Sequence, residues 1–114
     1  IGSEPFSQWH KPSAMLVNEG NYSDAHGSPY TYKTLGLGKL VGAPVPGTMT
    51  AVWWETQIDP DIVFGIPQVT NADLNGRPLE NVQLNPDIEV YNDPADELSG
   101  HDMQLEKAVR SLMK

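Results

Sequence analysis

Short apolar runs separated by glycine, proline and asparagine characterise this chain. Their length and their β-branched and aromatic content are typical of strands. The runs are residues 14–17, 39–41, 50–54 and 62–66. We expect the last run to end at Pro67, because proline cannot donate a hydrogen bond within a sheet. Asn75-Gly76 predicts a hairpin turn that joins residues 68–73 to residues 77–80.

Helices are predicted on either side of these runs. Ser28-Pro29 has the form of a helix start, with serine as the N-cap and proline in the first turn. That helix should run to about residue 35 and stop at Gly36. Asp93-Pro94 should begin a short turn or a second helix that Gly100 breaks.

The end of the chain has helical periodicity. Leu105, Val109 and Leu112 form an apolar stripe on a predicted helix that begins near residue 102. We expect this helix to pack on the sheet. If upstream elements are absent, some apolar surface should be left uncovered. We therefore expect self-association into a homo-oligomer and contacts to the missing N-terminal part.

Ser23-Asp24 lies between the run at residues 14–17 and the first predicted helix, either in the turn or in the first helical turn. A nucleophilic serine needs its oxygen held out on a bend, beside free backbone N–H groups that can receive an oxyanion. The N–H of Asp24 could be such a donor. Serine followed by aspartate is also common as a local cap or turn, so the local pattern leaves both interpretations open.

Composition narrows the function classes. The net charge is −8 and there are no cysteines. An acidic surface disfavours nucleic acid, and no apolar run approaches membrane-spanning length. Disulfides and thiolate metal sites are excluded. Asn71, Asp73 and Asn75 superficially resemble a calcium loop, but Val82 stands where a bidentate glutamate is needed, so we expect neither metal nor cofactor.

From residue 11 onward the chain resembles the C-terminal part of the catalytic domain of S41 serine peptidases, the tail-specific or C-terminal processing proteases. The matching pieces follow one another in the family's order. They are the step Asn18-Glu19, then Ser23-Asp24, Pro29-Tyr30, Gly36-Leu37-Gly38, Pro46-Gly47-Thr48, Leu79-Glu80-Asn81, the block at residues 86–90 and the helix at residues 102–108. The resemblance implies an α/β fold, specifically a ClpP/crotonase-like fragment that spans residues 1–114, with short strands, a helix after the nucleophile turn and a C-terminal helix.

Within that family, the residues favour the tricorn-like branch. The processing-protease branch pairs serine with a lysine in a later glycine turn, and Thr48 stands at that place here. The tricorn-like branch uses serine with a histidine and a late glutamate, which Glu80 matches. The resemblance therefore implies catalytic residues Ser23, Asp24 and Glu80, with Glu80 as the orienting third member of a triad.

The family's catalytic histidine comes from a segment well upstream of the nucleophile. This chain begins close to Ser23, so we expect it to be part of a larger bacterial enzyme and to have little activity alone. His10 and His26 are poor candidates for the general base, and His26 should point to solvent. The family works in the cytosol and in the bacterial envelope, which leaves the compartment open, with the periplasm favoured.

Two functions remain open at this point. The first is a serine endopeptidase that acts on peptides or unfolded protein through an acyl-enzyme. The second is a non-catalytic peptide-binding or scaffold domain on a degenerate peptidase fold. Trp53 and Trp54 should lie on opposite faces of one strand, one in the core and the other covering an interface, with a substrate platform as the alternative.

Overall fold

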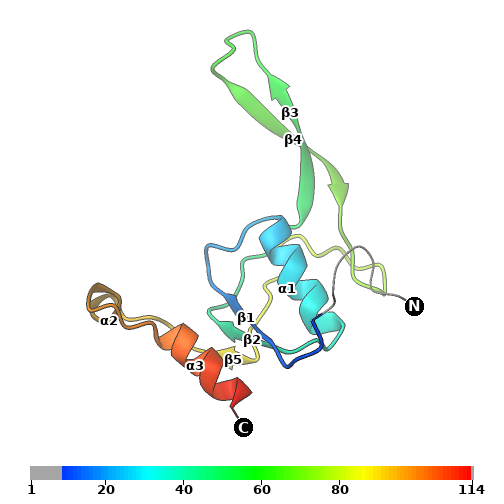
Figure 1. Cartoon of the computed structure of the whole chain (residues 1–114). Coiled ribbons are helices and arrows are strands. Elements are labelled where there is room, and N and C mark those ends of the chain that lie inside the picture. The colour runs from blue at the N-terminus through cyan, green and yellow to red at the C-terminus, as the bar shows by residue number, and fades with distance from the viewer. Residues whose placement is uncertain (1–8, 114) are drawn as a thin grey trace.

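The computed structural model describes residues 9–113 and contains a small parallel sheet at its centre (Figure 1). The sheet has the order β1-β2-β5, formed by β1 (Ala14–Val17), β2 (Lys39–Gly42) and the short β5 (Ile88–Glu89). Both strand pairs are parallel. The core is small, because few side chains are fully enclosed. Its buried apolar members are Val17, Leu40, Val41, Ala43, Val45, Leu79 and Ala108.

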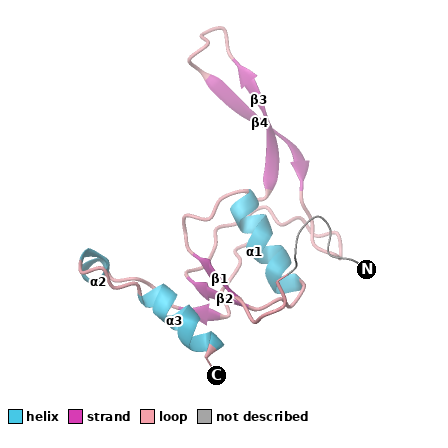
Figure 2. Ribbon diagram, viewed as in Figure 1, coloured by secondary structure: helices cyan, strands magenta, loops and turns pink. Residues whose placement is uncertain are grey.

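Helix α1 (Asp24–Thr34) connects β1 to β2 and packs beside the sheet (Figure 2). Its end agrees with the prediction, since Gly36 follows with a φ of +64°. The predicted start was wrong, because Pro29 is buried inside the helix rather than at its beginning. Proline cannot donate to the carbonyl four residues earlier. That carbonyl, of Ala25, instead accepts from the Asn21 side-chain amide at 2.7 Å, which compensates for the lost hydrogen bond.

Strands β3 (Thr50–Thr56) and β4 (Val63–Thr70) form an antiparallel two-stranded ribbon. We call residues 50–70 the arm. Figure 1 shows the arm leaving the sheet beside the top of α1 and extending away from the rest of the molecule. The prediction that Pro67 ends the strand was wrong, because β4 continues through Pro67 next to a bulge opposite Ala51 and Val52. Edge strands and bulges are the places in a sheet that accept proline.

The Asn75-Gly76 turn is confirmed, although it closes a much shorter hairpin than predicted. The two sides pair through an isolated bridge between Ala72 and Pro78. The carboxylate of Asp73 accepts the backbone N–H groups of Asn75 and Arg77, both at 2.8 Å. The acidic residue that resembled a calcium ligand is therefore engaged in the turn itself.

Two helices follow the sheet. Both α2 (Pro94–Leu98) and α3 (Met103–Leu112) begin at an aspartate N-cap, Asp93 and Asp102, whose side chains accept backbone N–H groups. Helix α3 packs against β1 and β2, as predicted. The contact face was wrong, because Ala108 is the buried residue. The apolar stripe that we expected there is half exposed, namely Leu105, Val109 and Leu112.

Among residues 9–113, no helix combines the length and the apolar character that a membrane span requires.

Candidate functional site

Ser23 occupies a strained backbone position immediately before α1. Its φ is 54° and its ψ is −116°, a conformation that residues other than glycine rarely adopt. Such strain persists only where the surrounding structure enforces it, and it concentrates at functional sites. The turn lies between a parallel strand and a helix and leaves Ser23 exposed. This is the arrangement that presents a nucleophilic serine on a sharp strand-to-helix bend.

Hydrogen bonds to both sides of the residue hold this conformation. The Ser23 N–H donates to the Thr48 hydroxyl at 3.1 Å, and the Ser23 carbonyl accepts from His26 and Gly27 at 2.8 and 3.1 Å. The first N–H groups of a helix have no partner within the helix. In the described part of the chain the Asp24 N–H has no hydrogen-bond acceptor, so it is free to donate to an anion beside Ser23.

Glu80 contacts residues 49–50, which directly follow Thr48. One of its carboxylate oxygens accepts the backbone N–H groups of Met49 and Thr50, at 2.7 and 2.6 Å. A hydrogen bond from the Thr50 side chain, followed by those from the Met49 and Thr50 backbone N–H groups, lowers the pKa of Glu80 below its ordinary value. Because these bonds favour the charged form, Glu80 is an ionised carboxylate near neutral pH.

Thr48 therefore connects two predicted site residues. Thr48 contacts Ser23, and the next two residues along the chain hold Glu80. The sequence showed Thr48 only as a residue that replaces a lysine, and it gave no sign that its hydroxyl supports the Ser23 turn. A threonine following Pro-Gly could have suggested a side-chain hydrogen bond, but its partner is distant in sequence.

His26 is buried, with 1% of its surface exposed, and the prediction that it faces solvent was wrong. Within residues 9–113 neither ring nitrogen has a hydrogen-bond partner, and the ring lies edge-on to Tyr30. Burial lowers the pKa of His26, and the negative charge of Glu80 opposes this shift. The side chain is consequently a neutral imidazole beneath the turn, without a hydrogen bond to Ser23.

The other described histidines lie elsewhere. His10 is exposed and precedes β1. His101 lies at the start of α3, where its ring contacts Asp96 and Glu106. The described residues thus bring Ser23, Asp24 and Glu80 to one region, and they do not place a histidine in hydrogen-bond contact with Ser23.

Two open cavities adjoin α1 and share Asp24, Gly27 and Thr31 in their linings. The first has a volume of about 650 Å³ and reaches Met15. The second, of about 410 Å³, lies between α1 and the turn at residues 71–74. Both cavities begin at Asp24, the residue after Ser23. No cluster of metal-ligating side chains occurs in residues 9–113.

Sequence comparison identifies the family of the chain. Residues 2–90 match the model of peptidase family S41. The chain belongs to peptidase family S41. The tricorn protease of Thermoplasma acidophilum is 30% identical over 100 residues, which are 87% of this chain and 9% of that protein. This S41 chain therefore spans about a tenth of the length of the curated relative that it matches.

Solved structures give the same result for the fold. The crystal structure of the tricorn protease superposes with a TM-score of 0.77 and 29% identity, covering 89% of this chain and 10% of the other. A candidate peptidase from Parabacteroides merdae superposes with a TM-score of 0.76 over the whole of this chain and 36% of the other. Its identity of 19% shows the fold alone. The α/β architecture predicted for this S41 chain is confirmed, and peptidase is its general class.

Proposed function

We propose that this chain carries the nucleophile of a serine endopeptidase that cleaves peptides or unfolded protein. The observation that supports this most is the strained, exposed Ser23 at the start of α1. In the first step, the Ser23 oxygen attacks the peptide carbonyl carbon and gives up its proton to a base. The backbone N–H of Asp24 donates to the oxyanion as the tetrahedral intermediate forms. The intermediate then expels the amine, which takes the proton, and leaves an acyl-serine.

The base is a histidine from outside the described residues. His26 does not fulfil this role, because its ring is buried and makes no hydrogen bond to Ser23. A base must come within hydrogen-bond reach of the proton that it removes. The tricorn protease matched here is about ten times as long as this chain, so such a residue can come from other parts of an enzyme of that kind.

Glu80 orients that histidine. Its Oε2 atom is fixed by two backbone N–H groups, which holds the carboxylate ionised and in a defined direction. The Thr50 side chain also hydrogen-bonds to this carboxylate. An ionised carboxylate has about four lone-pair sites, so it retains the capacity to accept the proton-bearing nitrogen of an imidazole. A carboxylate in this position selects the correct tautomer and stabilises the imidazolium that forms.

Hydrolysis of a fluorogenic peptide by the complete enzyme tests the proposal. Ser23→Ala should lower kcat by at least about a thousandfold, because the acyl-enzyme cannot form. Ser99→Ala is the control, since Ser99 is also exposed and lies at the end of α2, outside both cavities. It should leave kcat within about twofold of the unchanged enzyme. Hydrolysis that survives Ser23→Ala would show that another residue is the nucleophile.

A non-catalytic peptide-binding domain is the second candidate. It is favoured by one observation, the absence of a histidine partner for Ser23 among residues 9–113. If this alternative holds, the complete protein would bind peptides but would neither hydrolyse them nor react with a serine-directed reagent. The hydrolysis measurement therefore separates the two functions.

A further inference from the structure

We propose that the free edge of β3 is a docking site for an extended peptide segment, which adds to the arm as a third strand. The proposal rests on the proposed function in one respect, namely that the segment belongs to the substrate cleaved at Ser23. The surface itself is defined by the arm alone. Among the described residues β3 is paired only with β4, so one side of its backbone has no neighbouring strand.

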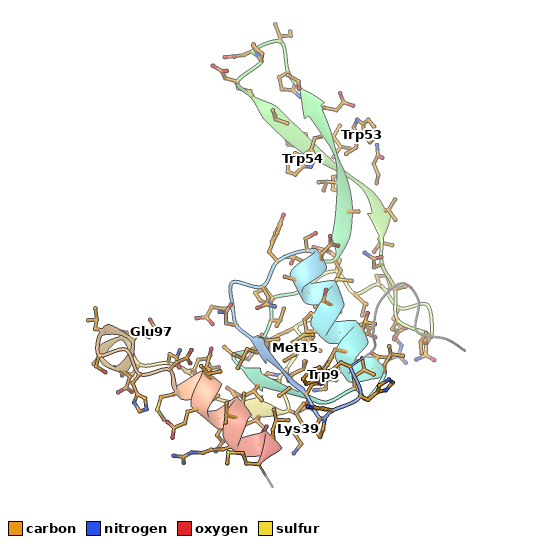
Figure 3. The ribbon with its side chains drawn as sticks, in the orientation of Figure 1. Trp9, Met15, Lys39, Trp53, Trp54 and Glu97 are labelled. Atoms are coloured by element: carbon orange, nitrogen blue, oxygen red, sulfur yellow. The ribbon has the colours of Figure 1, made fainter. Side chains whose placement is uncertain are left out.

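The arm lacks the support that an isolated ribbon needs. Two-stranded ribbons are marginally stable in water unless further strands or a packed face support them. Large apolar side chains are exposed on both strands, at 36–65% of their surface. They are Val52, Trp53, Trp54, Val63, Phe64, Ile66 and Val69. Figure 3 shows Trp53 and Trp54 on opposite sides of the ribbon. An exposed apolar patch of this kind marks an interaction surface.

The two edges of the arm differ. In an antiparallel strand alternate residues direct their N–H and C=O groups to the same side. The Gln57 N–H bonds across to Ile62, whereas the Thr50 N–H bonds to Glu80. Alternation from these two points directs Val52 and Trp54 outward, away from β4.

The outer edge of β4 is interrupted at the corresponding places. The partners of Val52 and Trp54 are Pro67 and Gly65, and a bulge follows beside Pro67. Natural sheets use proline and bulges to prevent further strands from adding to an edge. By contrast, β3 has the sequence Thr-Ala-Val-Trp-Trp-Glu-Thr, without proline, glycine or lysine. Of the two edges of the arm, the β3 edge is the one suited to accept another strand.

The β3 edge leads directly to the candidate site. The Thr50 N–H is held by Glu80, and Thr48, two residues earlier, holds the Ser23 turn. The Glu80 carboxylate therefore occupies the place that a partner strand's carbonyl would take at the start of the edge. A peptide running antiparallel to β3 would enter at the tip of the arm with its amino end and reach Ser23 with its carboxyl end.

Charge indicates which peptide fits. Near its tip the arm has Glu55, Asp59 and Asp61, and the sequence has no lysine or arginine from residue 40 to residue 76. The arm of a second copy would bring the same acidic residues and no lysine or arginine to match them. A peptide with alternating apolar side chains and a lysine or arginine near its amino end would complement both the apolar strand and the acidic tip.

The test measures binding of a labelled peptide of alternating valine and threonine with an amino-terminal lysine, by fluorescence anisotropy with the Ser23→Ala variant of the complete enzyme. We expect saturable binding that weakens about fivefold when glutamate replaces the lysine. N-methylation at the peptide positions that face β3 should weaken binding by at least about tenfold. N-methylation at the alternate positions is the matched control and should change binding by less than about twofold, because those amides face solvent.

Variants of the protein provide the second part of the test. Val52→Pro should weaken binding at least about tenfold, because it removes an outward donor, whereas Val52→Thr keeps the donor and should cost about twofold or less. Equal binding of both N-methylated peptides would overturn the proposal. So would a dimer in sedimentation that excludes the peptide. Binding that persists when Ser23 proves not to be a nucleophile would leave this inference intact and reject only the proposed function.

Discussion

The sheet with α1 and the arm are built from similar residues and differ in what covers them. In β2 Leu40 and Val41 are enclosed, with 0% of their surface exposed. In the arm Trp54 and Phe64 expose 65% and 60%. Strands that are apolar on both faces are typical of strands covered on both faces. The comparison shows that the sequence of the arm is suited to contacts that residues 9–113 do not supply.

The largest expected difference between the two regions is in the cost of removing an apolar side chain. Val45→Ala in the covered region should reduce the free energy of unfolding by about 2 kcal/mol, since Val45 is fully buried. Val63→Ala in the arm is the matched change at a half-exposed site and should cost less than about 0.5 kcal/mol. Urea denaturation of both variants measures this. Equal costs would show that the arm is covered in solution.

Protonation of the buried His26 should destabilise the covered region as the pH falls. The pKa of His26 is lowered by burial from an ordinary value of 6.5, so the unfolded chain takes up the proton first as the pH falls. Stability contributed by neutral His26 is present above pH 6.5 and lost below it, at no more than about 1.4 kcal/mol per pH unit.

Denaturation of the chain between pH 7 and pH 5 measures this loss. His26→Phe should remove most of the dependence in this interval, and His10→Phe, at an exposed site before β1, should leave it in place. An unchanged pH dependence in His26→Phe would mean that the imidazole is accessible to solvent.

Strain at Ser23 predicts a smaller effect, in which a substitution that relieves the strain raises the free energy of unfolding. Ser23→Gly should unfold at a free energy about 1 kcal/mol higher than Ser23→Ala, because glycine accepts a φ of 54° without steric cost. Thermal denaturation of the two variants compares them directly. Both lack the hydroxyl, so the difference reports the backbone alone. Equal stability would indicate that the turn is not strained.

The smallest effect is expected where the two regions join. Glu80→Gln should accelerate amide exchange at Met49 and Thr50, because a neutral amide accepts hydrogen bonds less strongly than a carboxylate. The lowered pKa of Glu80 means that its contribution is present above about pH 4.5 and is lost below it. Exchange at Leu40, inside the sheet, provides the control and should not change.

The sequence predicted elements that depend on local signals. Gly36 marks the end of α1, Asn75-Gly76 forms a turn, and Asp93 caps a short helix. Each of these depends on a few neighbouring residues, whose conformational preferences can be inferred from the sequence.

The predictions that failed depend on distant partners. The start of α1 is set by Asn21 and Thr48, which accommodate Pro29 inside the helix and hold Ser23 in its turn. The burial of His26 depends on packing that the helix pattern does not reveal. The prediction that one of the two tryptophans lies in the core was wrong for a related reason. Both are exposed, because residues 9–113 supply no core around the arm. The roles of Ser23, Asp24 and Glu80 came from family resemblance and stay predictions.

Mapping the site of reaction with a fluorophosphonate tests the central claim most directly. The complete enzyme that contains this chain would be labelled and digested, and the modified residue located by tandem mass spectrometry. We predict a single adduct on Ser23, absent from Ser23→Ala and retained in Ser99→Ala. An adduct on another serine of an active, folded enzyme, or no adduct at all, would contradict the assignment of Ser23 as the nucleophile.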